Sequence, residues 1–377
     1  MRTHSVQSKL LFVIDNISTG GAQRQLSSLA IGLARRNYKV DLFCFAPGDL
    51  LAKPLYEAGI TVHWKIKKTR YSPEIIFALS NLIEGAKYEL VVSFLSTPNF
   101  YAILAGRLIG RRRVPVVVSE RFCDLPQGVS ITERFVRQFY RFASHVTVNS
   151  HHQRLNLAKK YPKIQNRLST IYNGCDLEVF VPCNRKPFNN PLKILTIASI
   201  SPYKNGLCLV EALSLLRQRC GLEPNVTWIG QRVMSGDRLE YLKAMEQKIR
   251  LYNLQRQWQW VDPRSDIVKQ LHQHDVLVHP SFGEGLPNVV CEALSCASPV
   301  ILSDTLDHSR LVQHNKSGYL FNWKDPSDLA DKIRSFSLLS LGERTRMGHS
   351  GRSFAETHLS LNRFVDDYER LFSKYLH

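Results

Sequence analysis

The stretch VLVHPSFGEGLPNVVCEAL (276–294) combines a buried strand, a glycine-containing loop and the start of a helix. The apolar run VLV that opens it is typical of a strand covered on both faces. Gly283 and Gly285 permit a tight turn and a close approach of the backbone to a ligand. Pro287 suits the first turn of a helix, where its missing N–H is no loss. This unit predicts a parallel α/β sheet with a loop at the carboxyl end of the strand.

The same alternation of short apolar strands and amphipathic helices continues along the chain. The strands expected in the first half are 10–14, 39–45, 60–66, 88–94, 114–120, 145–150 and 169–174. Those expected in the second half are 193–199, 225–230, 258–262, 276–281, 299–304 and 318–322. The sequence therefore predicts an α/β protein with two doubly wound, Rossmann-like domains.

The length of 377 residues exceeds what one hydrophobic core usually supports. The segment VPCNRKPFNNP (181–191) contains three prolines and three asparagines without periodicity, which is typical of a linker. We expect an amino-terminal domain over 1–185, a carboxyl-terminal domain over 186–358, and a terminal amphipathic helix within 359–377 that packs back on the first domain. Ligands of such sheets bind at the carboxyl ends of strands, so two facing domains predict a site in the cleft between them.

Positive charge is concentrated in the first half. Residues 1–190 contain 27 Lys+Arg against 12 Asp+Glu, whereas residues 191–377 contain 23 against 20. The basic groups include Lys65, Lys67, Lys68, Arg70 and the run at 111–113. This excess indicates an anionic partner, either nucleic acid, an anionic membrane leaflet or a phosphate-bearing substrate, or it serves solubility alone.

The eight cysteines contain no C-x-x-C pair and are interpreted as reduced thiols. No cluster of His, Cys or Asp has the spacing of a metal site, so no metal is expected. No segment reads as a signal peptide or a membrane span. We expect a cytoplasmic protein, with any membrane contact peripheral and at the inner face of the plasma membrane.

Two carboxylates accompany the start of the helix in 276–294. Glu284 lies in the loop, and Glu292 lies about one and a half turns inside the helix. The N–H groups of residues 286–289 favour an anion such as a diphosphate, and carboxylates accept hydrogen bonds from sugar hydroxyls. A solvated helix with incidental acids explains Glu292 poorly, because its neighbours are apolar. His279, in the strand, is interpreted as a buried core residue.

The segment FGEGLPNVVCEAL, with seven residues between its glutamates, resembles the donor-site signature of family 4 glycosyltransferases, which are retaining enzymes of the GT-B architecture. Three further segments are similar to that family in the same order: STGGAQRQLSSLA (18–30), IYNGCDLEVF (171–180) and ILTIASISPYKNGLCLVEAL (194–213). The resemblance covers most of the chain. It implies an acceptor-side first domain and a second domain that binds a nucleotide sugar.

The resemblance also implies roles for individual residues. Lys204 would bind the donor diphosphate, Glu284 would contact the transferred sugar, and both are expected to be catalytic. Glu292 would hold the ribose hydroxyls. The other expected donor-binding residues are Gly21, Ser199, Asp262, Gly285, Leu286, Pro287 and Asn288. The expected acceptor-side residues are Gly20, Glu120, Arg121 and Asn173.

Two departures from the family pattern stand out. Ser199 occupies the place of an arginine that contacts phosphate, so either Lys204 and the helix N-terminus suffice or another cation, such as Arg121 or Arg232, assists. The segment 93–100 lacks the usual histidine, and together with 117–122 it looks like the branch that acts on lipid-linked oligosaccharides. Glu120 and Arg121, which follow a strand, either open into the cleft or form a structural ion pair.

The implied activity is retaining transfer of a hexose or N-acetylhexosamine from a nucleotide diphosphate sugar, for which we expect UDP. The expected acceptor is a free or lipid-linked glycan, in particular one linked to polyprenyl diphosphate, in surface-polysaccharide or glycan biosynthesis. No cofactor is expected beyond the nucleotide sugar, and no nucleic acid. The alternatives are a UDP-sugar epimerase or phosphorylase on the same scaffold, and a non-enzymatic protein that binds nucleic acid or an anionic membrane.

Overall fold

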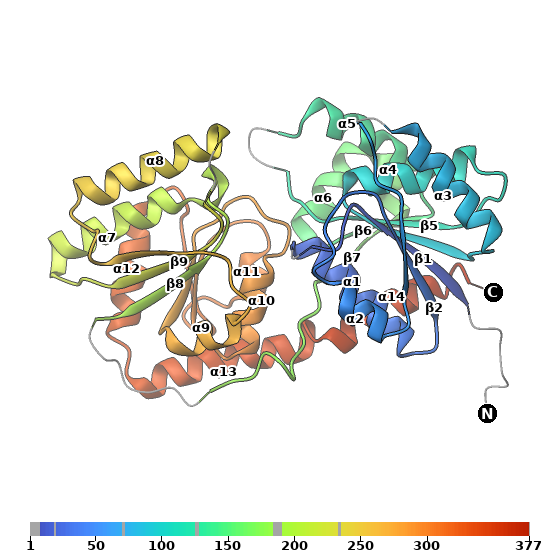
Figure 1. Ribbon diagram of the computed structural model, residues 1–377. Coiled ribbons are helices and arrows are strands. Elements are labelled where there is room, and N and C mark those ends of the chain that lie inside the picture. Colours follow the sequence, from blue (N-terminus) through green and yellow to red (C-terminus); the bar gives the residue numbers. More distant parts are fainter. Residues whose placement is uncertain are drawn as a thin grey trace. The chain divides into compact units, whose positions relative to one another are not determined.

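The computed structural model describes residues 8–18, 20–69, 72–124, 128–183, 191–232 and 235–376. It divides into two compact units (Figure 1). The first unit comprises Met1–Gly174 together with Leu361–His377, and the second comprises Cys175–Ser360.

The first unit is built on a parallel seven-stranded sheet with the order β3-β2-β1-β4-β5-β6-β7. Its strands are β1 (Lys9–Ile14), β2 (Lys39–Cys44), β3 (Thr61–Trp64), β4 (Leu90–Phe94), β5 (Val116–Glu120), β6 (His145–Val148) and β7 (Leu168–Thr170). Its helices are α1 (Gly21–Ala34), α2 (Ala52–Glu57), α3 (Pro73–Gly85), α4 (Ser96–Ile103), η1 (Leu104–Ile109), α5 (Ile131–Gln138), η2 (Phe139–Phe142), α6 (His151–Lys160), η3 (Pro162–Arg167) and α14 (Leu361–Phe372). The central strands β4 and β5 are buried along their whole length and β1 is buried from Leu10 onward, because helices cover both faces.

The second unit is built on a parallel six-stranded sheet with the order β10-β9-β8-β11-β12-β13. Its strands are β8 (Lys193–Ile197), β9 (Asn225–Ile229), β10 (Trp258–Val261), β11 (Val276–His279), β12 (Val300–Ser303) and β13 (Tyr319–Phe321). Its helices are η4 (Pro202–Lys204), α7 (Gly206–Cys220), α8 (Gly236–Leu251), α9 (Ile267–Gln273), α10 (Asn288–Ser295), α11 (His308–Leu311), α12 (Pro326–Ser337) and α13 (Leu341–His358). The predicted class of two doubly wound α/β domains is confirmed.

The segment that follows Gly174 belongs to the second unit, whereas the sequence placed the boundary after residue 185. The backbone N–H of Cys175 donates to Leu359 O at 2.7 Å. Arg352 Nη1 donates to Phe180 O, also at 2.7 Å. These bonds attach residues 175–180 to α13 and to the residue that follows it, so the chain joins the second unit ahead of the proline-rich segment 181–191. Residues 184–190 of the expected linker lie outside the described residues.

Helix α14 completes the core of the first unit. Its buried face packs into the same hydrophobic cluster as β1, α1 and β2, and consists of Phe364, Val365, Tyr368, Leu371 and Phe372. Just after α1, Arg36 pairs with Asp366 and Glu369 of α14 at 2.6 Å each. Gly32 of α1 allows close approach, because a Cβ added there would lie 2.5 Å from Val365 Cγ2.

Within the described ranges, none of the helices has the length and apolar character needed to cross a bilayer.

The glycine in α1 provides a test of this packing. We expect Gly32→Ala to destabilise the first unit by about 1–2 kcal/mol, because overpacking against the stiff Val365 side chain outweighs the gain in helix propensity. The matched control is Gly85→Ala at the end of α3, where an added Cβ meets nothing within 4 Å. It should leave stability unchanged or raise it by up to about 1 kcal/mol. Thermal midpoints measure both, and equal shifts would contradict the close α1–α14 contact.

Candidate functional site

An ion pair between Lys204 and Glu284 joins two loops at the carboxyl edge of the second sheet. Glu284 Oε1 also lies 3.1 Å from His279 Nε2, at the end of β11. Burial alone would raise the pKa of the Glu284 carboxyl, but Lys204 and His279 outweigh it and lower that pKa well below its ordinary value. Glu284 is therefore an anion held between two nitrogen groups. The side chains of Lys204 and Glu284 retain 12% and 17% exposure, which leaves both within reach of a ligand.

Backbone and side-chain contacts hold the two loops together. Ser281 Oγ and Phe282 N both donate to Tyr203 O, at 3.1 and 2.9 Å. The Phe282 ring stacks on Trp323 with centroids 4.4 Å apart. Asn205, in the left-handed region at φ 57°, donates its amide to Trp323 O at 2.8 Å. The turn that carries Lys204 is therefore fixed beside the loop that carries Glu284.

A second buried histidine, His308, packs against His279. The rings of His279 and His308 meet edge to face with centroids 5.7 Å apart. His308 Nδ1 donates to Ser303 O at 2.8 Å, since that carbonyl can only accept. Burial, assisted by the neighbouring His279, lowers the pKa of His308 to about 4. His279, which the sequence analysis interpreted as a core residue, thus also contacts the candidate site.

Apart from Gly21, which begins α1 in the first unit, the remaining expected donor-binding residues lie at the same edge of the second sheet. Gly285, Leu286 and Pro287 are buried in the loop, and α10 begins directly afterwards at Asn288. Glu292 is 5% exposed on the buried side of α10. Ser199 follows β8 and is half-buried, whereas Asp262 follows β10 and is exposed. Because the strands are parallel, their carboxyl ends bring these loops together.

In the first unit, Arg121 is a buried cation that bonds to neutral groups. Its guanidinium donates to Asn173 Oδ1 at 2.8 Å and to Tyr368 Oη at 2.9 Å. It also lies 3.8 Å from the centroid of the Phe94 ring. Within the described ranges, no carboxylate pairs with it. Burial lowers the pKa of Arg121, and the neighbouring Tyr368 partly opposes this shift.

The glycine loop of the first unit is tied to the Asn173 segment. Gly20 and Gly21 are exposed where α1 begins. One turn into α1, the Gln25 amide exchanges two hydrogen bonds with the backbone of Gly174, each at 2.8 Å. Three of the four expected acceptor-side residues, Gly20, Arg121 and Asn173, are therefore connected through α1 and the segment Asn173–Gly174.

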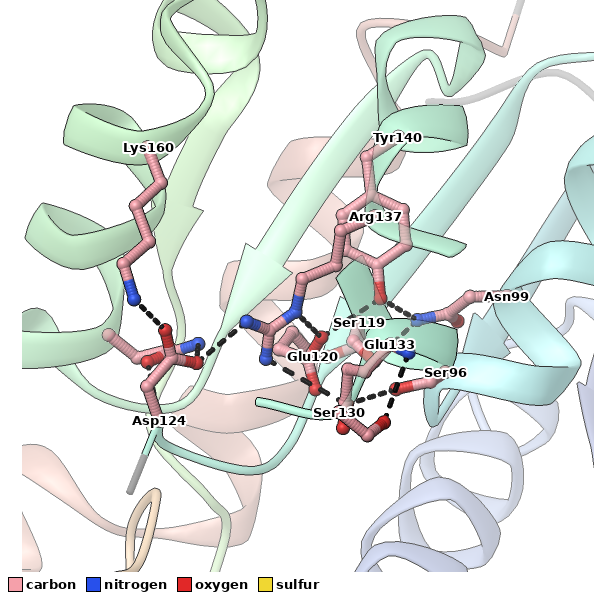
Figure 2. A network of polar contacts seen from close by, with 11 residues as sticks. Ser96, Asn99, Ser119, Glu120, Asp124, Ser130, Glu133, Arg137, Tyr140 and Lys160 are labelled. Carbon is pink, nitrogen blue, oxygen red and sulfur yellow. Dashed lines mark hydrogen bonds and ion pairs between the residues drawn. The ribbon is translucent and has the colours of Figure 1, made fainter. Parts of the chain in front are cut away.

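Glu120 is part of a buried ionic network instead of an exposed strand end (Figure 2). Its carboxylate accepts hydrogen bonds from Arg137 Nε at 3.2 Å and Tyr140 Oη at 2.9 Å. Asp124 accepts from Arg137 Nη1 and Lys160 Nζ, both at 2.6 Å. Burial raises the pKa of Glu120, and the opposing effect of Arg137 is smaller.

This network corrects both interpretations of the Glu120–Arg121 pair. Glu120 is 1% exposed, so it does not open toward solvent, and its cation is Arg137 instead of Arg121. The sequence pattern around Glu120 does not identify Arg137, because this partner lies on a different element, 17 residues away. The available signal was that a carboxylate at the end of a fully buried strand requires a cation.

Among the residues that the structure describes, no group of three or more His, Cys, Asp or Glu side chains is arranged to hold a metal ion.

Comparison with known families and proteins assigns both halves of the chain. Residues 19–179 match Glycosyltransferase Family 4, and residues 184–354 match Glycosyl transferases group 1. A Campylobacter jejuni protein, "GalNAc-alpha-(1->4)-GalNAc-alpha-(1->3)-diNAcBac-PP-undecaprenol alpha-1,4-N-acetyl-D-galactosaminyltransferase", is 25% identical over 335 residues, covering 86% of this chain and 88% of that protein. An Escherichia coli "UDP-Gal:alpha-D-GlcNAc-diphosphoundecaprenol alpha-1,3-galactosyltransferase" is 25% identical over 265 residues, 66% of each chain.

Solved structures show the same fold. Anabaena Alr3699/HepE in complex with UDP-glucose has a TM-score of 0.82 at 20% identity, covering 97% of this chain and 99% of that one. A glycosyltransferase from Rickettsia africae also has a TM-score of 0.82, at 17% identity and 98% of each chain. The predicted fold class and the prediction of an enzyme are confirmed.

The pKa of His308 predicts a pH dependence of stability. Because the folded pKa is about 4 and the ordinary value is 6.5, the unfolded chain binds the proton more readily. The stabilising contribution is therefore complete above pH 6.5 and is lost as the pH falls toward 4. We expect His308→Asn, which keeps an N–H donor and does not titrate, to show a smaller fall in thermal midpoint between about pH 7 and pH 5 than the wild type. Parallel curves would contradict this assignment.

The network in Figure 2 predicts a large effect of its central cation. Arg137→Met leaves the Glu120 carboxylate buried without its cation, so we expect the free energy of unfolding of the first unit to fall by about 3–5 kcal/mol. Arg134→Met, on the exposed side of the same helix, should change it by less than about 0.5 kcal/mol. Chemical denaturation measures both. Similar values for the two variants would show that the network contributes little.

Proposed function

This chain belongs to the glycosyltransferases, with a family 4 domain followed by a group 1 domain, and we propose that it transfers a hexose or N-acetylhexosamine from a UDP-sugar to a polyprenyl-diphosphate-linked glycan. The names of the two relatives described above support this choice. Both names specify an undecaprenol-diphosphate-linked glycan as the acceptor, written "PP-undecaprenol" in one and "diphosphoundecaprenol" in the other, and one name specifies a UDP-sugar as the donor. The observation that carries the proposal is the Lys204–Glu284 pair at the carboxyl edge of the second sheet.

On the donor side, the pair supplies both charges that a nucleotide sugar requires. Lys204 offers a point cation for the diphosphate, and the amino end of α10 adds backbone donors nearby. Glu284, whose lowered pKa keeps it ionised, accepts hydrogen bonds from sugar hydroxyls. Ser199 provides only a neutral hydroxyl where the family has a cation, so Lys204 contributes most of the positive charge. Glu292 is proposed to bind the ribose hydroxyls.

We propose that transfer proceeds with retention on one face of the sugar. The bond from the anomeric carbon to the diphosphate oxygen breaks, a bond to the acceptor oxygen forms, and the departing phosphate takes the acceptor proton. Glu284 is held by Lys204 and His279, an arrangement that suits a carboxylate used for binding. The protein then contributes orientation and positive charge for the leaving group, and no metal enters the scheme.

On the acceptor side, we propose Arg121 and Asn173, with Gly20 beside them, as the groups of the first unit that face the acceptor. A guanidinium that bonds only to neutral groups within the described ranges keeps a positive charge that no carboxylate neutralises, which suits it to attract a phosphate. Glu120 is left out, because its carboxylate is committed to Arg137. Such an acceptor is held in a lipid bilayer, so we propose a peripheral position at the inner face of the plasma membrane.

The proposal predicts the effect of two substitutions. Lys204→Ala removes the cation and leaves Glu284 without its main partner, and Glu292→Ala removes the proposed ribose ligand. We expect each to lower kcat/KM at least about 100-fold and to reduce the thermal stabilisation by UDP-sugars. Transfer of radiolabelled sugar to a polyprenyl-diphosphate glycan, with UDP-, GDP- and ADP-sugars compared, measures the first effect.

The matched control is Lys243→Ala with Glu240→Ala, an exposed ion pair on α8, which should leave turnover unchanged. Wild-type turnover in either site variant would overturn the site assignment. Sugar release or isomerisation without an added acceptor would favour the epimerase or phosphorylase alternative.

A further inference from the structure

Helix α5 turns two charged side chains, Glu133 and Arg137, toward the sheet and its large apolar side chains Ile131 and Phe135 toward solvent. Glu133 and Arg137 lie on the inner side, within the network of Figure 2. Ile131 and Phe135, which are four residues apart and share the opposite face, are 85% and 57% exposed.

This orientation is the reverse of that in an ordinary surface helix, where the apolar stripe faces the core. Among the described residues, Val136 and Tyr140 are the only apolar side chains of α5 and the following turn that are buried. Arg137 binds the carboxylates of Glu120 and Asp124, so the helix cannot rotate to bury Ile131 without breaking these ion pairs. The exposed apolar face is therefore fixed by the fold.

The exposed side chains continue into an aromatic ridge. The ring of Phe135 lies 5.2 Å from that of Phe139 and 6.1 Å from that of Phe100, which belongs to α4. The rings of Phe100 and Phe139 are 4.9 Å apart. Figure 1 shows α5 and α4 as neighbours within the first unit. A contiguous apolar surface on a fixed helix marks a contact site.

The charges around the ridge select the partner. Arg134 and Arg141 are exposed on the same segment, and the Arg141 guanidinium lies 4.7 Å from the Phe142 ring. Residues 1–190 carry more than twice as many basic as acidic side chains. Isoleucine and phenylalanine flanked by arginines are the combination that inserts into the interface of an anionic bilayer.

We propose that the outer face of α5 and the following turn η2, formed by Ile131, Phe135 and Arg134 of α5 with Arg141 of η2, docks the protein on an anionic lipid bilayer. The inference rests on the proposed function in one respect, because it assumes that the acceptor is held in the membrane. It adds the surface by which the enzyme reaches that membrane.

The test is cosedimentation with vesicles of phosphatidylcholine containing about one-third phosphatidylglycerol. Ile131→Gln with Phe135→Gln removes the apolar groups without changing charge, and we expect binding to weaken about tenfold or more. Arg134→Gln with Arg141→Gln should weaken binding to these vesicles and should have little effect on the weaker binding to pure phosphatidylcholine.

The matched control is Leu251→Gln with Leu338→Gln, two second-unit residues that are 68% and 76% exposed, and it should bind as the wild type does. Absence of wild-type binding, or equal binding by the Ile131/Phe135 variant, would overturn the proposal. A wild-type dimer that this variant converts to a monomer, without vesicle binding by either, would overturn it in favour of a second copy of the chain.

Transfer to a short-chain acceptor in detergent separates this proposal from the proposed function. The Ile131/Phe135 variant should keep wild-type transfer and thermal midpoint while it loses vesicle binding. If the wild-type protein binds vesicles but transfers no sugar, the docking surface stands and the proposed function fails.

Discussion

Parallel pairing of the strands is the constraint on which the arrangement of both units depends. Since all strands of a sheet run in one direction, every loop that follows a strand emerges at the same edge. Residues far apart in the chain, such as Ser199, Asp262 and Glu284, therefore lie along one edge of the second sheet. In the first unit the same constraint puts Arg121, after β5, at the edge where α1 begins. The chemistry of each unit is thus gathered by topology, and short contacts such as Ser281 to Tyr203 then fix its geometry.

The sequence was sufficient for features that depend on local pattern. Continuous apolar runs predicted the strands, as at 276–279, because a strand buried on both faces allows few polar residues. The loop with Gly283 and Gly285 predicted the turn before α10. Strand limits were less accurate: the strand expected over 60–66 covers only Thr61–Trp64, and the strand expected over 169–174 covers Leu168–Thr170.

Features that depend on distant partners could not be predicted in this way. The ion pair between Glu120 and Arg137 forms between a strand and a helix, and nothing in the local pattern of either segment identifies the other. The attachment of Cys175 to the end of α13 places the boundary between units earlier than the proline-rich segment suggested. His279 fits a buried strand by its position alone, and its contact with Glu284 depends on how the loop folds back over the strand end.

The place of α14 has a consequence for the order of folding during synthesis. Phe364, Tyr368 and Phe372 fill the core of the first unit, yet they follow all of the second unit in the chain. A ribosome therefore releases every strand of both sheets before the first unit can close its core. The second unit is contiguous, so it can fold as soon as Ser360 has emerged. The half of the protein that is made first is the half that is finished last.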